Sequence, residues 1–278
     1  MTRGQRTVEV GNLKVGNHLP LTLIAGPCVI ENEKHALSTA ERLVRMTSDL
    51  GIGLIYKSSY DKANRSSIKS FRGVGLRRGL SILHKVRQKF GVPVVSDVHN
   101  EMEMPAAGAE LDVIQIPAFL CRQTDMLLAA ARTGRAVNVK KGQFMAPWDM
   151  AAVAEKIVSG GNDKVMLTER GTSFGYNNLV ADFRSLPIMA KHGFPVIFDA
   201  THSVQLPGKM GDSSGGERQY APALTRAAVA VGVAGVFLEV HPNPNEAPCD
   251  GANMLFLRQL PELLEDLIAI DKLVKKTA

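Results

Sequence analysis

The chain has 278 residues, of which 45% are hydrophobic and 22% charged, a balance typical of a globular protein with a large buried core. It contains no run of about 18 apolar residues, so we expect no transmembrane helix. The formal net charge is +6, but lysine and arginine do not gather in one block. This pattern favours anionic small substrates over nucleic acid or a membrane surface.

Two further features concern the cellular location. The first residues lack the continuous apolar segment of a signal peptide, which predicts a cytoplasmic protein. The three cysteines, Cys28, Cys121 and Cys249, are too few for a disulfide framework. Free thiols or a metal ligand are therefore expected.

The N-terminal segment, residues 1–20, contains two short strand-like pieces, TVEV and LKV, on either side of a Gly-Asn pair. Such a pair between strand-like pieces predicts a β-hairpin. We expect this hairpin to close the bottom of the domain that follows.

From residue 21 onward, short apolar runs alternate with helical patterns, as in a parallel sheet whose strands are buried on both faces. The apolar runs cover 22–27, 54–59, 92–98, 112–117, 136–140, 164–169, 195–200 and 235–240. The helical patterns cover 33–50, 75–90, 101–108, 123–133, 149–160, 182–192, 218–232 and 254–275.

Eight such units predict an α/β fold, a single (β/α)8 TIM barrel with an N-terminal β-hairpin. The predicted domain spans 1–278, with the hairpin over 1–20 and the barrel over 21–278. A doubly wound open sheet is the alternative. The eight units and the absence of a Gly-rich fingerprint after the first strand argue against it.

Polar residues occupy the end of every predicted strand, where enzymes on this fold build their active sites. They are Cys28, Lys57, Ser59, Asp97, Gln115, Lys140, Arg170, His202 and Glu239. Each one alone is compatible with a paired surface residue, but the recurrence at all eight strand ends favours an active site.

These residues divide by chemistry. The cations suit phosphate and carboxylate groups and predict an anionic substrate; they are Lys57, Lys62, Arg65, Lys140 and Arg170. A thiolate, an imidazole and two carboxylates predict a divalent metal site formed by Cys28, His202, Glu239 and Asp250.

Alternatives to this metal site remain open. Cys28 would also suit a small buried position and His202 a satisfied loop position, while Cys121, His99 and His241 compete as ligands. The long Gly/Ser-rich loop over 207–219 is either a lid over the barrel mouth or a plain connection.

Longer motifs around these residues resemble those of the 3-deoxy-D-manno-octulosonate 8-phosphate synthases, nearly from end to end. The motifs are AGPCVIE (25–31), YKSSYDKANRSS (56–67), SDVH (96–99), IQIPAFLCRQTD (114–125), NVKKGQF (138–144), ERGTSFGYNNLVAD (169–182), IFDATHSVQLPG (197–208), SSGGERQ (213–219) and LEVHPNPNEAPCDGAN (238–253).

The resemblance implies an enzyme, a transferase of lipopolysaccharide biosynthesis. It would condense phosphoenolpyruvate with D-arabinose 5-phosphate and water to give 3-deoxy-D-manno-octulosonate 8-phosphate and phosphate. Two alternatives are the related synthase that uses erythrose 4-phosphate and a non-catalytic phosphate-sensing barrel. The erythrose enzyme typically has a KPRTS-like segment where this chain has KANRSS over 62–67.

The resemblance also implies roles for individual residues. Phosphoenolpyruvate would be held by Lys57, Ser59, Lys62, Gln115, Lys140 and Arg170, and the sugar phosphate by Asn64, Arg65 and Ser66. Arg122 would reach into the site of a neighbouring subunit of a homotetramer. The candidates for catalytic work are Lys62, Asp97, Lys140 and His202.

The family has a metal-dependent and a metal-independent branch. Cys28 places the chain in the metal-dependent branch, although Cys249-Asp250-Gly251 resembles a motif of the other branch. The ligand set would suit iron, zinc, manganese or cobalt.

Overall fold

A computed structural model describes residues 4–65, 67–208 and 215–276. Its centre is a closed parallel barrel, because the last barrel strand pairs with both the first strand and the one before it. This confirms the predicted fold. The barrel strands are β3 (Thr22–Gly26), β4 (Gly53–Lys57), β5 (Val94–Asp97), β6 (Val113–Ile116), β7 (Ala136–Lys140), β8 (Val165–Glu169), β11 (Val196–Asp199) and β14 (Gly235–His241).

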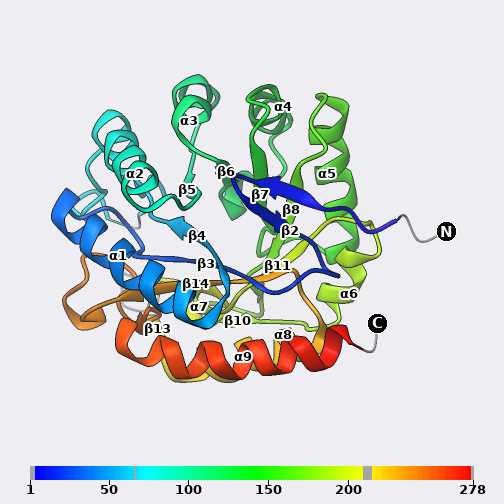
Figure 1. The fold of residues 1–278 in the computed structure, drawn as a ribbon. Coiled ribbons are helices and arrows are strands. Elements are labelled where there is room, and N and C mark those ends of the chain that lie inside the picture. Colours follow the sequence, from blue (N-terminus) through cyan, green and yellow to red (C-terminus); the bar gives the residue numbers. More distant parts are fainter. Residues whose placement is uncertain (1–3, 66, 209–214, 277–278) are drawn as a thin grey trace.

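A ring of helices covers the outside of the barrel (Figure 1). They are α1 (Glu33–Leu50), α2 (Leu76–Phe90), α3 (Met104–Glu110), α4 (Thr124–Arg132), α5 (Met150–Ser159), α6 (Ser185–Ala190), α8 (Ala221–Val231) and α9 (Leu260–Lys275). A short extra helix, α7 (Ala200–Ser203), follows β11 directly. Among the described residues, every helix is too short or too polar to cross a lipid bilayer.

Four helices, α3, α6, α8 and α9, begin at least three residues later than predicted, and three of them have a proline as their second residue. The helices α3, α8 and α9 carry Pro105, Pro222 and Pro261 there, and a 3₁₀ turn precedes each of them. Proline lacks an N–H group, which costs nothing in the first turn, where that group has no helical partner. The prolines therefore mark the helix starts that the apolar periodicity placed too early.

The predicted hairpin is confirmed as β1 (Val8–Val10) and β2 (Leu13–Val15), joined at Gly11-Asn12. Gly11 has a φ of +57°, a conformation that glycine adopts without steric cost. Val8, Val10 and Val15 are buried against inward-facing barrel residues. Figure 1 shows the hairpin lying across one end of the barrel, so it closes the N-terminal end as expected. The division of the chain at residue 20 stays a prediction.

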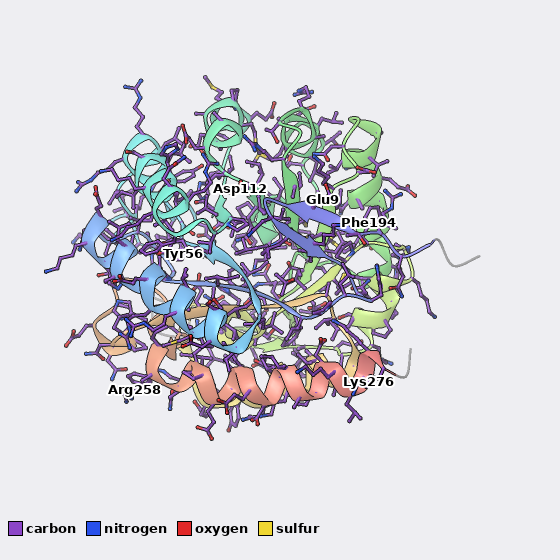
Figure 2. All side chains as sticks on the ribbon, in the orientation of Figure 1. Glu9, Tyr56, Asp112, Phe194, Arg258 and Lys276 are labelled. Atoms are coloured by element: carbon purple, nitrogen blue, oxygen red, sulfur yellow. The ribbon has the colours of Figure 1, made fainter. Side chains whose placement is uncertain are left out.

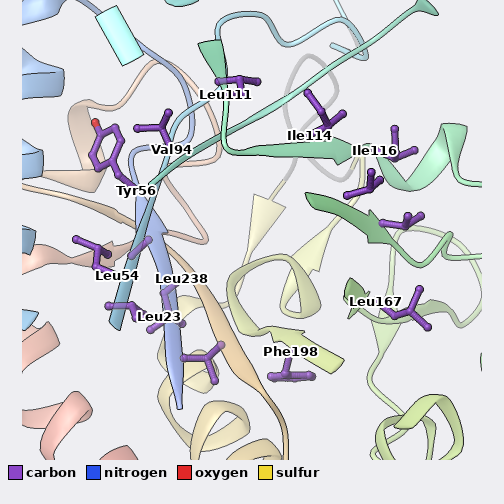
Figure 3. Close-up of a cluster of buried hydrophobic side chains, with 14 of the residues drawn as sticks. Leu23, Leu54, Tyr56, Val94, Leu111, Ile114, Ile116, Leu167, Phe198 and Leu238 are labelled. Atoms are coloured by element: carbon purple, nitrogen blue, oxygen red, sulfur yellow. The ribbon is translucent and has the colours of Figure 1, made fainter. Parts of the chain in front are cut away.

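Side chains along each strand alternate between the outer face of the barrel and its interior. Outward-facing residues such as Leu23, Leu54 and Phe198 pack under the helices in the main core, which Figure 3 shows. Figure 2 shows side chains throughout the space between the strands and the helices. The C-terminal helix, α9, extends along this layer from near Arg258 to Lys276. The helices therefore hold the strands at fixed positions.

Inward-facing residues form two halves. In the N-terminal half they are apolar and pack with the hairpin; they are Ile24, Ile55, Val95, Val113, Ala136, Met166, Ile197 and Phe237. One step further along the strands they are polar and still buried; they are Lys57, Asp97, Gln115, Asn138, Lys140, Thr168, Asp199 and Glu239. The change from apolar to polar inside one barrel positions the candidate site.

The loops at the C-terminal end carry small strand pairs. β9 (Thr172–Ser173) pairs with β10 (Leu179–Val180), and β12 (Gln205–Leu206) pairs with β13 (Gly215–Gly216). Outside the barrel, β15 (Leu255–Phe256) extends the sheet beside β14. The predicted lid over 207–219 includes residues 209–214, which lie outside the described residues.

Candidate active site

A cavity of about 430 Å³ opens at the C-terminal ends of the strands. Its wall contains most of the residues that the sequence predicted to converge. They are Lys57, Lys62, Asn64, Arg65, Asp97, Gln115, Lys140, Arg170, His202 and Asp250. The convergence of these side chains is therefore an observed feature of the fold, while their roles stay predictions.

The remaining predicted residues lie elsewhere. Cys28 and Glu239 are buried behind the cavity wall, and Ser59 is buried against Asp97. Arg122 is exposed on the outside of the molecule. The last one, Ser66, lies outside the described residues.

A hydrogen-bonded belt begins at Ser59, just after β4, and crosses β5, β6, β7 and β8 in the polar half. Ser59 Oγ donates to Asp97 Oδ2 at 2.5 Å, and Gln115 Nε2 donates to Asp97 Oδ1 at 2.6 Å. Asn138 Nδ2 then donates to Gln115 Oε1 at 2.9 Å, and Thr168 Oγ1 donates to Asn138 Oδ1 at 2.6 Å. The belt fixes the amide orientation of Gln115, because its oxygen and its nitrogen both have a partner.

Asp97 is an anion in this belt. Burial raises the pKa of a carboxyl, but the ammonium groups of Lys62 and Lys57 outweigh burial and hold the pKa of Asp97 well below its usual range. An ionised carboxylate that already accepts two hydrogen bonds is suited to orienting its neighbours. This favours an orienting role for Asp97 over the direct catalytic work for which the sequence made it a candidate.

A second anion, Asp199, joins two of the predicted catalytic residues. Its Oδ2 accepts from Lys140 Nζ at 2.5 Å and lies 2.8 Å from His202 Nδ1. Its Oδ1 accepts a hydrogen bond from the backbone N–H of His202 at 3.0 Å, and this bond caps the N-terminus of α7. Because Asp199 contacts Nδ1 of the His202 ring, the other nitrogen, Nε2, faces Glu239. A carboxylate orients many metal-binding histidines in this way.

The charges around Asp199 shift two pKa values. Burial lowers the pKa of Lys140 to about 8, although Asp199 opposes that effect. Burial raises the pKa of Asp199, but His202 and Lys140 outweigh it and hold the value well below its usual range. Sequence reasoning missed Asp199. Its position at the end of an apolar run, like that of Asp97, was the available signal.

Lys57 is buried in the wall of the cavity and paired with Glu239. Its Nζ lies 2.5 Å from Glu239 Oε1 and donates to the backbone oxygen of Cys28 at 3.1 Å. Gly26 allows this close approach of β3 and β4, because a Cβ atom there would lie 1.9 Å from the Lys57 carbonyl oxygen. Burial raises the pKa of Glu239, but Lys57, His202 and Lys62 outweigh it and lower the value to about 2.

The two cavity arginines retain unused donors. Arg170 is buried, and its Nη2 donates to Gln205 Oε1 at 2.9 Å, while its Nη1 has no hydrogen-bond partner among the described residues. Arg65 lies 4.0 Å from Asp250, and its Nε also has no hydrogen-bond partner in the described part of the chain. Guanidinium groups with buried, unpartnered N–H groups are suited to binding phosphate or carboxylate. Sequence reasoning did not find Gln205, which holds Arg170.

The predicted metal ligands surround Asp250. Its Oδ2 accepts from Cys28 Sγ at 3.2 Å, and its carboxylate also lies within 4.8 Å of ligand atoms on His202 and Glu239. Glu239 Oε2 is buried without a hydrogen-bond partner among the described residues and lies 3.7 Å from His202 Nε2. An orphaned carboxylate oxygen beside an imidazole nitrogen fits a divalent cation. The residues therefore suit the predicted metal.

The competing ligands do not join this group. His241 forms a separate cluster with Glu31 and His35, while Cys121 and His99 belong to no candidate cluster among the described residues. Cys249, by contrast, lies with Cys28 and Asp250 within 4.8 Å.

Together, the fold and the site define a (β/α)8 barrel with a cation-lined cavity at the C-terminal end of its strands, where enzymes of this fold build their active sites. Comparison with known proteins then places the sequence: residues 5–276 match the DAHP synthetase I family, and the chain belongs to that family.

Full-length relatives carry one common name. The chain is 61% identical to the 2-dehydro-3-deoxyphosphooctonate aldolase of Geobacter metallireducens, a match that covers 97% of this chain and 99% of that protein. It is 58% identical to the protein of that name from Syntrophotalea carbinolica, with 97% of each chain covered. The Brucella ovis protein of the same name is 57% identical over 99% of both chains.

Proposed function

We propose that this chain condenses phosphoenolpyruvate with D-arabinose 5-phosphate and water, giving 3-deoxy-D-manno-octulosonate 8-phosphate and phosphate, and that it is a transferase. The names of its relatives and the motifs around the cavity support this assignment. The observation that carries it is the set of lysine and arginine side chains that line one cavity. Arg65 and Arg170 each have a nitrogen without a hydrogen-bond partner among the described residues, which suits the binding of two anionic substrates.

The reaction requires C3 of phosphoenolpyruvate to attack the aldehyde carbon while water attacks C2. Holding both reactants in contact removes several kcal/mol of entropic barrier. In our proposal Arg170, Lys140 and Gln115 orient phosphoenolpyruvate, with Lys57 and Ser59 setting the charge and shape of the wall behind them. Asn64 and Arg65, with Ser66, hold the sugar phosphate.

Proton transfer falls to groups with suitable pKa values and contacts. Lys140, with a pKa of about 8, can exchange a proton near neutral pH. His202 is oriented by Asp199 toward the same cavity. Lys62 remains an ammonium, because Cys28, Glu239 and Asp97 outweigh burial and raise its pKa well above the usual range. It therefore stabilises negative charge in the cavity.

The proposed cofactor is one divalent metal ion, either iron, zinc, manganese or cobalt. Cys28, His202, Glu239 and Asp250 would hold it. When bound, such an ion polarises a carbonyl oxygen or lowers the pKa of water. Metal analysis before and after chelation tests this part. Activity lost on chelation and restored by added metal is expected, whereas full activity in metal-free protein would contradict it.

We also propose that the enzyme is a homotetramer in which Arg122 reaches a neighbouring site. Exposed aromatic side chains follow the neighbouring strands β6, β7 and β8, and Arg122 also follows β6; they are Phe119, Phe144, Trp148, Phe174 and Tyr176. An apolar surface of this kind is typical of a subunit contact. Sedimentation of the parent and of Trp148→Asp tests it, because a charge in the contact should dissociate the assembly. The cytoplasmic location stays a prediction.

The choice of aldehyde decides between this function and its alternatives. We expect a higher kcat/KM with D-arabinose 5-phosphate than with erythrose 4-phosphate, with phosphate released in the assay. An equal or reversed preference would assign the chain to the erythrose reaction. Binding of both substrates without phosphate release, in metal-loaded protein, would assign it to a sensor.

A further inference from the structure

Two cysteines meet beside the proposed metal site, although they are far apart in the sequence. The Sγ atoms of Cys28 and Cys249 lie 2.7 Å from each other. Both side chains are buried, with exposed fractions of 1% and 3%. They belong to a small separate cluster with Val29 and Met254, so they do not fill the main core.

The backbone next to Cys249 has an unusual conformation. Asp250 has a φ of +47°, in the left-handed region that non-glycine residues seldom adopt. At this turn the Cys249 thiol, the Asp250 carboxylate and the Cys28 thiol have their ligand atoms within 4.8 Å of one another. Such backbone strain concentrates at functional sites, where the surrounding structure maintains it.

The Cys249 sulfur also shares the charge environment of the site. Asp250 joins the cysteine pair to Glu239, and Lys62 Nζ lies 3.8 Å from Glu239 Oε1. Two thiols, a carboxylate and a nearby cation thus form one continuous group with the His202 and Glu239 pair, joined through Asp250.

From this geometry we propose that Cys249 is a second thiolate ligand of the metal, so that the ion is bound by two sulfurs. This inference rests on the proposed metal site and adds a ligand to it. Two thiolates select thiophilic ions, so the site should prefer zinc or cadmium over manganese.

Another cluster illustrates why the cysteine pair is the stronger candidate. His241 Nε2 lies 2.8 Å from Glu31, and His35 is close to both. However, His241 Nδ1 accepts the backbone N–H of Asn243 at 3.0 Å. Neutral His241 therefore carries its proton on Nε2, the atom that a metal would need, and donates it to Glu31. Cys249 differs, because loss of the thiol proton turns its sulfur into a metal ligand.

X-ray absorption spectroscopy of the zinc-loaded full-length protein, kept reduced, tests the proposal directly. The parent should show two sulfur neighbours at about 2.3 Å. Cys249→Ser should show one sulfur and bind zinc at least about tenfold more weakly, since even outer contacts of a metal site cost that much. Cys121→Ser is the matched control, because Cys121 is buried but lies in no candidate cluster of the described residues.

The outcomes separate the two proposals. If the parent has a single sulfur neighbour and Cys28→Ser removes it, whereas Cys249→Ser changes neither the count nor the affinity, the second ligand is excluded and the metal site stands. If the parent binds no zinc, the metal site itself fails, and Cys249 with it. Circular dichroism first checks that Cys249→Ser retains its helical signal. If the signal is lost, Cys249→Ala is used in its place.

Discussion

The two halves of the barrel interior differ sharply in what they contribute. The N-terminal half is filled by apolar side chains and sealed by the hairpin, as in a conventional core. The C-terminal half is equally buried but consists of charges and hydrogen bonds, with Lys57, Lys140, Asp199 and Glu239 all at most 5% exposed.

The difference shows that separate parts of one fold provide its stability and its candidate active site. Burying charges costs free energy unless they are paired, and even paired charges rarely exceed apolar residues in stabilising value. The polar half therefore depends on the apolar half and the helix layer for its stability. In return, its side chains are held in place before any substrate binds, which is what electrostatic catalysis requires.

The largest effect on stability should come from the apolar half. Met166 is fully buried among the inward-facing apolar residues. Met166→Ala should lower the free energy of unfolding by about 2–5 kcal/mol through the cavity it leaves, measured by urea titration. Its kcat/KM at 25 °C should stay at the parental value. Met166→Leu, which conserves volume, should cost less than about 1.5 kcal/mol. A large loss of activity in folded Met166→Ala would contradict the separation of the two halves.

The opposite pattern is expected for Arg170. Arg170→Ala should raise the KM for phosphoenolpyruvate about ten- to a hundredfold, because a charge-assisted hydrogen bond to an anion is worth about 1.5–3 kcal/mol. Stability should not fall, since Arg170 is buried with one nitrogen lacking a partner among the described residues. Arg78→Ala, on an exposed face of α2, is the control. An unchanged KM would remove Arg170 from the substrate site.

These two halves also differ in how well the sequence predicted them. The alternation of apolar runs and helical patterns gave the barrel, since burial on both faces leaves a clear mark on each strand. The polar strand ends were visible because Lys57, Asp97 and Glu239 interrupt apolar runs. Their partners were not, because pairing depends on which neighbouring strand a side chain faces. Asp199 stands at the end of an apolar run, but only the structure shows that it contacts Lys140 and His202. The contact of Gln205 with Arg170 is likewise visible only in the structure.

A third prediction concerns the pH dependence of the polar half. If the reaction needs protonated Lys140, kcat/KM should fall as the pH rises through about 8, where Lys140 loses its proton. Asp199 raises this pKa, so Asp199→Asn should move the fall to lower pH. It should also reduce kcat roughly 10- to 100-fold, as for other lost outer contacts.

A pH profile of kcat/KM for both proteins measures this shift. Asp49→Asn, an exposed change on α1, is the control and should leave the profile in place. If Asp199→Asn lowers kcat but keeps the alkaline fall at the parental pH, the titrating group is not Lys140.

The smallest effect should come from the far end of the hydrogen-bonded belt. Thr168 donates to Asn138, which is two links away from Asp97. Thr168→Val keeps the shape of the side chain and removes one donor, so the free energy of unfolding should fall by about 1 kcal/mol. Asn138 then loses one of the hydrogen bonds that fix its orientation. Because Asn138 donates to Gln115, the side chain of Gln115 becomes less firmly oriented as well. The KM for phosphoenolpyruvate should therefore rise slightly while kcat holds. Thr168→Ser keeps the hydroxyl group and should restore the KM, although it loses a buried methyl group. If Thr168→Ser and Thr168→Val raise the KM equally, packing around residue 168 sets the KM and the belt does not orient the substrate site.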